Sequence, residues 1–552
     1  MRRAHRVLSA TVTFALASLT LLADEPAVEK APAEQAAPAV AAAPATPAAA
    51  AARMSTKELA QWIDSQFEPL WSDEEKSRHP VVGDAVFLRR VSLDLLGSIP
   101  SVAAARDFLA DPSEYKRDLY INNILGLAGQ KSRVTDRSAE HLARVWRRVL
   151  VPGNGPGAAM AAGLDPWLKI QFSDNVHYDK MARALVLAKP EAVPAPVAGV
   201  PVGFRPSAGP IVLYEAVGPT PENLANSFAR TFLGVRIGCA QCHDHPFAQW
   251  KQDDFWGVAA FFAGTGRGPN GEWKDEKVTK IRNEANSTDY DARFLWGESP
   301  NFPADKSPRE VFADWMTSPN NPNFASTAVN RIWQYLCGRG LTSAVDDLDT
   351  ATPEERKVLD QLAEQFERHD YDLRWLIGGI CQSRTYQRAC SSDESEELVG
   401  TRPVKTLLPE QVYDSLEQAL ALPVSRIDNG PRHNGQMNEL IGRLNEAIGN
   451  NPEEFRGGIP QTLLLMNGQM IAKATDLQES RTLRAVVEAP FLRSEQKLDA
   501  LFLAAFTRKP TDEERAFLMQ YVEAESDKQK QKTAYAEIFW GLLNSPEFVL
   551  SQ

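Results

Sequence analysis

Apolar positions recur at steps of three and four residues along most of the chain, which is the spacing of an amphipathic helix. The pattern begins after Ser55, where Ser55 and Glu58 have the spacing of a capping box. It is clear again in 137-RSAEHLARVWRRVL-150 and 221-PENLANSFARTFLGV-235. We therefore predict that residues 55–263 form a helical domain in which Pro- and Gly-rich loops separate the helices.

A polar, Gly-rich stretch at 264–304 interrupts the helical pattern, and we expect a linker there with at most a short β-hairpin. Ser307-Pro308-Arg309-Glu310 combines a capping box with proline at the first helical position, which predicts a helix start. The helical spacing continues through 355-ERKVLDQLAEQFERHDYDLRWLIGGI-380. Residues 305–552 are therefore predicted to be a second helical domain. The expected fold class is mainly α, with two helical domains and long irregular loops.

The first residues have the pattern of a secretory signal peptide. Arg2, Arg3 and Arg6 precede an apolar run that ends at Ala23, and this run is short for a membrane span. A retained membrane anchor is the alternative. Residues 24–54 are mostly Ala, Pro, Glu and Val, a composition typical of a disordered spacer. We therefore expect cleavage after residues 1–23, export to the periplasm or cell surface, and no membrane span in the mature chain.

The net charge of the chain limits the kinds of partner that we expect it to bind. The formal net charge is −12 over 552 residues, which argues against a general nucleic-acid-binding surface. No Walker loop, G-x-S-x-G elbow or dinucleotide fingerprint occurs in the sequence. Whether the protein is an enzyme stays open at this stage.

The segment 234-GVRIGCAQCHDHPFAQW-250 carries the clearest chemistry. Cys239, Cys242 and His243 have the C-x-x-C-H spacing of a covalent c-type haem site, in which two thioethers hold the porphyrin and the histidine binds the iron. A Cys239–Cys242 disulfide is one alternative. A zinc site that uses His243 with His245 and Asp244 is another. Asp244 is also suited to capping a helix. His245 is equally suited to a functional role and to a structural one.

A sixth iron ligand is not identified by the sequence. Met466 is the first candidate, beside Met316, His141 and His177, and each is also a typical core or surface residue. An open iron site is equally compatible with the motif. The remaining cysteines, Cys337, Cys381 and Cys390, have no metal-ligand spacing.

A polar group in the second domain has two interpretations. Asn330, Arg331, Arg384 and Tyr386 are expected to be buried, either around a site or in a structural network. A buried Arg331 needs acceptors, for which Asp346 and Asp347 are the candidates.

The motif segment resembles a known family. The runs 232-FLGVRIGCAQCHDHPFAQWKQDDFWGVAAFF-262 and 89-RRVSLDLLGSIPS-101 are similar to a cytochrome-like domain of unknown function found in secreted planctomycete proteins. The second half is similar to the companion domain that follows it, in 308-PREVFADWMTSPNNPNFASTAVNRIWQYLCGRGL-341, 345-VDD-347, 383-SRTYQ-387, 462-TLLLMNG-468 and 543-LNSPEF-548. Two departures are Cys337, where relatives have an aromatic residue, and the absence of a His-bearing run before residue 360.

The resemblance implies a secreted, mostly helical protein with two domains. Its cytochrome label rests on the same C-x-x-C-H and adds no independent evidence for haem. Three hypotheses follow: one c-type haem used for electron transfer or redox chemistry with a redox partner, a haem-free binding or scaffold protein of the cell envelope with a Cys239–Cys242 disulfide, and a metal-dependent enzyme that uses His243 and His245.

Overall fold

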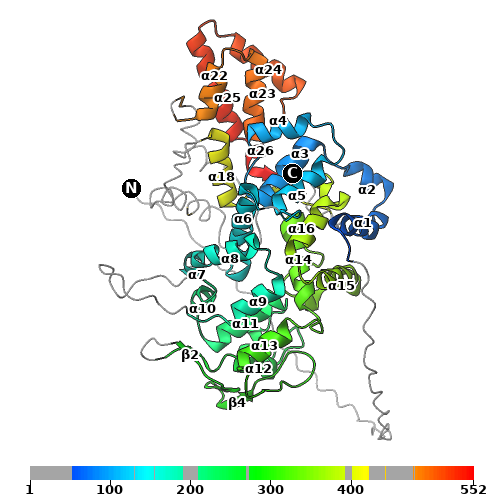
Figure 1. Ribbon diagram of the computed structural model, residues 1–552, viewed down its shortest axis with the longest axis vertical. Coiled ribbons are helices and arrows are strands. Elements are labelled where there is room, and N and C mark those ends of the chain that lie inside the picture. Colours follow the sequence, from blue (N-terminus) through cyan, green and yellow to red (C-terminus); the bar gives the residue numbers. More distant parts are fainter. Residues whose placement is uncertain are drawn as a thin grey trace, which may run out of the picture. The chain divides into compact units, whose positions relative to one another are not determined.

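The computed structural model describes residues 53–129, 131–153, 156–190, 209–268, 273–391, 401–421, 442, 476–477 and 479–552. Helices dominate these residues, and the strands form only short two-stranded sheets, which confirms the mainly α fold class (Figure 1). The signal peptide expected at 1–23, the spacer up to residue 52, and Met466 lie outside the described residues.

The helices before residue 264 are α1 (Thr56–Phe67), α2 (Asp73–Arg78), α3 (Asp84–Leu96), α4 (Val102–Ala110), α5 (Lys116–Leu125), α6 (Arg133–Leu150), α7 (Pro156–Ala161), α8 (Asp165–Ser173), α9 (Tyr178–Val186), α10 (Val212–Val217), α11 (Pro221–Phe232) and α12 (Gln252–Ala260). Those after residue 304 are α13 (Pro308–Met316), α14 (Phe324–Cys337), α15 (Pro353–Arg368), α16 (Leu373–Gln382), α17 (Arg384–Gln387), α18 (Pro409–Leu420), α22 (Arg481–Glu488), α23 (Ser494–Phe506), α24 (Asp512–Glu523), α25 (Lys528–Leu543) and α26 (Pro546–Val549). Single 3₁₀ turns lie at η1 (Glu68–Leu70), η2 (Ala162–Leu164), η3 (Gly238–Gln241) and η4 (Leu348–Thr350).

Both predicted helix starts are confirmed by their capping geometry. Ser55 accepts a hydrogen bond from the Glu58 N–H, and the Glu58 carboxylate accepts one from the Ser55 N–H, so α1 begins with a complete capping box. Ser307 and Glu310 form the same box at the start of α13, with Pro308 at its first position. These signals involve residues three apart, so they act without tertiary contacts.

The helical run predicted over 355–380 is broken into α15 and α16. Asp370 (φ 54°) and Tyr371 (φ 61°) adopt left-handed backbone conformations between the two helices. The Tyr371 carbonyl accepts a hydrogen bond from the Tyr178 N–H at 3.0 Å, and Asp372 caps α16. A contact from a distant helix therefore holds a turn that the apolar spacing did not indicate.

The segment predicted as a linker forms two antiparallel strand pairs. β1 (Thr265–Arg267) pairs with β2 (Trp273–Asp275), and β3 (Lys280–Asn283) pairs with β4 (Thr288–Asp291). β3 and β4 contact α12. A third pair joins β5 (Lys405–Thr406) to β6 (Leu550–Ser551) at the C-terminus. The β5–β6 pair therefore joins segments that lie far apart in the sequence.

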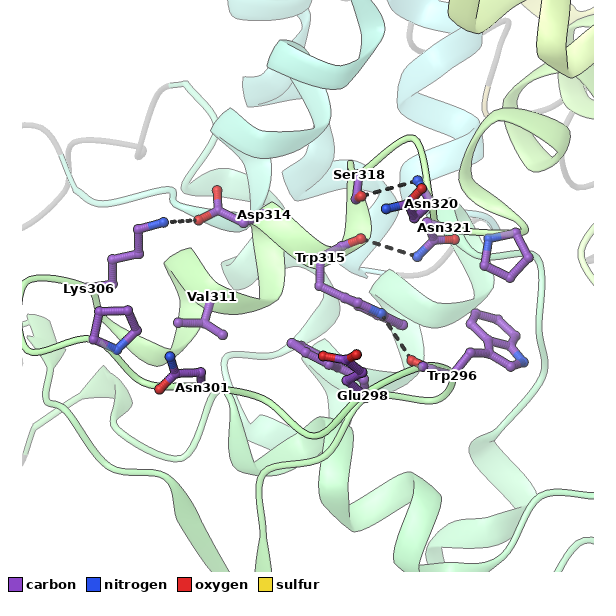
Figure 2. Close-up of a pocket in the computed structure, with 14 residues that line it drawn as sticks. Trp296, Glu298, Asn301, Lys306, Val311, Asp314, Trp315, Ser318, Asn320 and Asn321 are labelled. Atoms are coloured by element: carbon purple, nitrogen blue, oxygen red, sulfur yellow. Dashed lines mark hydrogen bonds and ion pairs between the residues drawn. The ribbon is translucent and has the colours of Figure 1, made fainter. Parts of the chain in front are cut away.

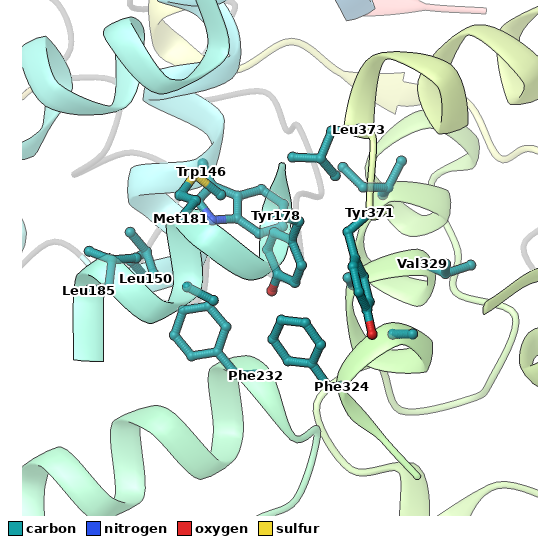
Figure 3. Close-up of a cluster of buried hydrophobic side chains, with 14 of the residues drawn as sticks. Trp146, Leu150, Tyr178, Met181, Leu185, Phe232, Phe324, Val329, Tyr371 and Leu373 are labelled. Carbon is teal, nitrogen blue, oxygen red and sulfur yellow. The ribbon is translucent and has the colours of Figure 1, made fainter. Parts of the chain in front are cut away.

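Two hydrophobic cores lie within residues 53–552. The larger core draws buried side chains from residues 59–386 and from Leu503, so it joins the two predicted domains. Figure 3 shows its centre, where Trp146 of α6 and Tyr178 of α9 face Phe324 of α14, and the Tyr178 and Phe324 rings stack at 5.1 Å. The smaller core is formed mainly by α18 and α22–α26, which gather together in Figure 1. The domain boundary at 264–304 stays a prediction.

Of the four polar residues expected to be buried, Asn330, Arg331 and Tyr386 are buried and Arg384 is not. Arg384 is exposed, with 68% of its side chain accessible, so the prediction of burial is wrong for this residue. Arg331 is buried, but it donates to the backbone carbonyls of Thr231 (3.2 Å) and Arg230 (2.8 Å) at the end of α11. Asp346 instead pairs with Arg236 at 2.5 Å. Carbonyls at a helix end lack intrahelical partners, which makes them natural acceptors for a buried guanidinium.

In the part of the chain that the structure describes, no helix has both the length and the apolar composition that crossing a bilayer requires.

Candidate functional site around the C-x-x-C-H segment

The two motif cysteines lie on a single helical turn at the surface. η3 spans Gly238–Gln241, and the Cys239 and Cys242 side chains are both exposed. Side chains three residues apart on a 3₁₀ turn lie on the same side, so the two thiols face the same region of solvent. Buried Ala240 anchors the turn between them. A Cβ at Gly238 would lie 2.8 Å from the Asn226 Oδ1, so a larger residue there would require the exposed Asn226 side chain to move.

Helix α12 holds the backbone of the motif from behind. The Trp256 indole N–H donates to the Gln241 carbonyl at 3.1 Å, and the Gln252 amide donates to the Cys242 carbonyl at 2.7 Å. Asp244 accepts a hydrogen bond from the Gln252 N–H at 3.0 Å, in the first turn of α12. Asp244 therefore caps a helix, and the positions of the two cysteines are set by side chains on a rigid element.

His243 has one ring nitrogen available for a ligand. Its Nδ1 lies 2.8 Å from the Asp244 carbonyl oxygen, and because a carbonyl only accepts, Nδ1 carries the proton. In the neutral imidazole the lone pair is then on Nε2. A backbone carbonyl bound to Nδ1–H is the usual arrangement for a histidine that binds a metal through Nε2. His243 is exposed, so Nε2 is not enclosed by the core.

The neutral His245 ring is the opposite tautomer to that of His243. Its Nδ1 accepts hydrogen bonds from the N–H groups of Phe247 (3.2 Å) and Ala248 (2.9 Å), so the proton of the neutral ring is on Nε2. The His245 N–H also donates to the Trp250 carbonyl at 2.8 Å, which closes the 245–250 loop. His245 thus has a structural role here. Among the described residues, no group of three or more His, Cys, Asp or Glu side chains is arranged to hold a metal ion.

An acidic segment of the second half contacts this loop. The Trp250 indole N–H donates to Asp349 at 2.8 Å, across 99 residues of sequence. Burial raises the pKa values of Asp347 and Asp349, and the negative charge of Asp346 adds to the increase at Asp347. Sequence reasoning missed Asp349, because no local pattern links it to residue 250. This contact ties the motif loop to the segment that follows α14.

Met316 and His141, two of the candidates for a sixth ligand that the structure describes, have other roles. Met316 is fully buried in the larger core. His141 is also buried, its Nε2 lies 2.6 Å from the Tyr335 hydroxyl, and burial lowers its pKa to about 3, so its ring is neutral. His177 is the residue before α9. Met466 lies outside the described residues, and the structure therefore does not test it.

All five cysteines are free thiols in the structure, so the Cys239–Cys242 disulfide is not formed there.

Without haem, we expect Cys239 and Cys242 to react fast with iodoacetamide because both are exposed. Cys337 and Cys381 are buried; burial raises the pKa of Cys337 to about 12 and that of Cys381 well above its usual value. Both should react at least about 100-fold more slowly. Peptide mass spectrometry of timed samples measures the rates, and similar rates for Cys337 and Cys239 would contradict the packing.

Comparison with known families gives two matches in order along the chain. Residues 62–267 match the family model PSCyt2, a protein of unknown function (DUF1549), and residues 308–444 match PSD1, a protein of unknown function (DUF1553). The first match contains the C-x-x-C-H segment. The quoted segments 462–468 and 543–548 lie beyond the second match. No curated protein and no solved structure matches the chain. The chain therefore belongs to the family in which a cytochrome-like PSCyt2 domain is followed by its companion PSD1 domain.

Proposed function

We propose that this chain is an exported protein that holds one c-type haem covalently through Cys239 and Cys242, with His243 as an axial ligand, and that it transfers electrons to or from a redox partner. The observation that carries the proposal is the geometry of the motif: two exposed thiols on one helical turn, followed by a histidine whose Nε2 lone pair is free. The N-terminal pattern of residues 1–23 supports export, and c-type haem is attached outside the cytoplasm.

The residues present fit the chemistry of attachment. Cys239 and Cys242 would each hold the porphyrin through one thioether to a vinyl group, an addition that needs no oxidant and has no leaving group, and His243 would bind the iron. The hydrogen bonds from Trp256 and Gln252 keep the backbone of the turn fixed, so the two sulfur atoms and the imidazole need little reorganisation. When bound, haem supplies one-electron chemistry at the iron.

The surface beside the motif supports a bound apolar group or partner. Phe247 is 96% exposed, although it lies in the ordered 245–250 loop next to His243. A large aromatic side chain that is almost fully exposed loses the free energy of burial, about 2 kcal/mol, unless something covers it. Phe247 is therefore placed to contact an apolar group bound beside His243.

The test is expression of the chain behind a periplasmic signal in a host that attaches c-type haem. We expect the denatured protein to be heavier by one haem and to give the reduced pyridine spectrum of a c-type haem. Cys239→Ala with Cys242→Ala should abolish attachment, because no thioether can form. His243→Ala should lower the yield of attached haem by about tenfold or more. The variant removes both the imidazole that would bind the iron and its hydrogen bond to the Asp244 carbonyl, and both act on the affinity for haem.

Two variants serve as matched controls. Cys390→Ala removes a half-buried thiol outside the motif, and His177→Gln removes an imidazole at the start of α9. Both should keep the full haem content. A haem-free protein whose mass shows an oxidised Cys239–Cys242 pair would overturn the proposal in favour of a binding or scaffold role. Zinc found in stoichiometric amount would overturn it in favour of a metal site.

A further inference from the structure

A cavity of about 560 Å³ lies between residues 294–306 and the end of α13 with the loop that follows it (Figure 2). This volume is within the usual range for small-molecule sites. Neither match to known families assigns it a role, since both describe proteins of unknown function. The cavity does not include the motif cysteines, so its ligand need not be the haem proposed above.

Three partly exposed aromatic rings line one side of the cavity. Trp315 of α13 stacks on Phe294 with centroids 4.7 Å apart and planes within 7°, and it lies 6.1 Å from Trp296 with planes 28° apart. The Trp315 indole N–H donates to the Trp296 carbonyl at 3.3 Å, and Trp250 packs edge-on against Trp296. The rings are therefore held in place, and their faces are close to parallel.

The polar side of the cavity carries groups that the protein itself does not use. In the part of the chain that the structure describes, the side chains of Glu298, Asn301 and Asn320 make no hydrogen bond or ion pair. Figure 2 shows Glu298 and Asn301 at the cavity without an interaction drawn to either. The Asn side chains offer both donors and acceptors, which is what a ligand with several hydroxyl groups requires.

The charges around the cavity argue against an anionic ligand. Lys306 is paired with Asp314 at 2.7 Å, and Asp314 also pairs with Arg183, so no unpaired cation lines the described part of the cavity while the Glu298 carboxylate is free. An anionic ligand would be repelled. A quaternary ammonium ion could bind over a tryptophan face beside the Glu298 carboxylate, so choline is the competing ligand that the test below includes.

We propose that this cavity binds a neutral sugar unit of an oligosaccharide. One face of a pyranose ring is apolar C–H surface, which packs on a flat indole, and its edge carries hydroxyl groups. The partly exposed rings of Trp296 and Trp315 supply flat apolar surface, with one face of Trp315 covered by Phe294, and Asn301, Asn320 and Glu298 supply partners for the hydroxyls. The proposal is independent of haem attachment, because it uses none of the motif residues.

The test is calorimetric titration of the full chain with three neutral hexaoses: β-1,4-linked glucose, β-1,3-linked glucose and β-1,4-linked mannose. At least one is expected to bind with a Kd between about 10 μM and 1 mM. Trp296→Ala and Asn301→Ala should each raise the Kd by about tenfold. Trp167→Ala, at a partly exposed tryptophan of α8, should leave it unchanged. Asn301 is exposed, so Asn301→Ala reports on the cavity even where Trp296→Ala disturbs folding.

Three outcomes would overturn the proposal. The first is no heat of binding for any of the three hexaoses at about 5 mM. The second is binding of a hexaose that neither Trp296→Ala nor Asn301→Ala weakens. The third is tighter binding of choline or of a polygalacturonate fragment than of every neutral hexaose, which would show that charge rather than the stacked rings selects the ligand.

Discussion

Replacement of Asp94 with asparagine is expected to lower the free energy of unfolding by about 3–5 kcal/mol. Asp94 of α3 is 1% exposed, and its carboxylate accepts from Arg402 at 2.7 Å, from Lys405 at 3.0 Å and from the Tyr386 hydroxyl at 2.8 Å. Burial by itself would raise its pKa, but the two cations hold the pKa well below its usual value. Loss of this charge leaves Arg402, which is 2% exposed, without its carboxylate partner.

Urea unfolding followed by tryptophan fluorescence measures this effect. Asp107→Asn is the control, because Asp107 is an exposed carboxylate on the neighbouring helix α4 and should change the unfolding free energy by less than about 0.5 kcal/mol. The double variant Asp94→Asn/Arg402→Met should lose less than the sum of the two single losses, since both charges then leave the core together. A loss below about 1 kcal/mol for Asp94→Asn would show that the network contributes little.

We expect acid to destabilise the protein because it protonates the Glu410 carboxylate, and this effect should also be large. Glu410 of α18 is buried and pairs with Arg148 and, at 3.5 Å, with Arg147, both of α6. Burial favours the protonated carboxyl, but the two arginines prevail and lower the pKa of Glu410 to about 2. A carboxyl whose folded pKa is depressed stabilises the fold above its unfolded pKa of 4.5, and it loses that contribution as the pH falls toward 2.

The size of this effect follows from the two pKa values. Between about pH 5 and about pH 3, protonation of Glu410 should cost the wild-type protein roughly 2 kcal/mol of unfolding free energy. Glu410→Gln is less stable at pH 5 but has no such group to titrate, so its loss over the same interval should be smaller by that amount. Chemical unfolding at the two pH values measures both proteins.

Glu74→Gln is the matched control for the pH experiment. Glu74 is an exposed carboxylate of α2, so its removal should leave the wild-type dependence on pH unchanged. Parallel losses for the wild type and Glu410→Gln would show that other carboxylates, such as Asp94, account for the acid sensitivity.

Several features of the candidate site could be predicted because they depend on neighbours in the sequence. The C-x-x-C-H spacing predicts two thiols on one turn, and in the structure both are exposed, Cys239 on η3 and Cys242 directly after it. Asp244 was a candidate for helix capping, and in the structure it accepts a hydrogen bond from the first N–H of α12. The roles of the two histidines were not predictable, because they depend on which carbonyl or N–H group reaches each Nδ1.

The cavity and the buried charges could not be predicted from local patterns. The Trp250–Asp349 contact spans 99 residues, and Arg402 meets Asp94 across 308. Arg331 was expected to need a carboxylate, yet helix-end carbonyls satisfy it. Long polar side chains choose partners by proximity after the helices have packed, and spacing in the sequence does not record that proximity.

The sequence by itself determined the helical class, the helix starts at Ser55 and Ser307, and the C-x-x-C-H spacing that makes residues 239–243 the candidate site. These follow from apolar spacing, capping residues and motif spacing, which act over a few residues. Only the tertiary structure decided the shared core, the Trp250–Asp349 contact, and the aromatic cavity around Trp296 and Trp315. Each of these requires surfaces from distant segments to meet, because burial and hydrogen bonding depend on distance in space.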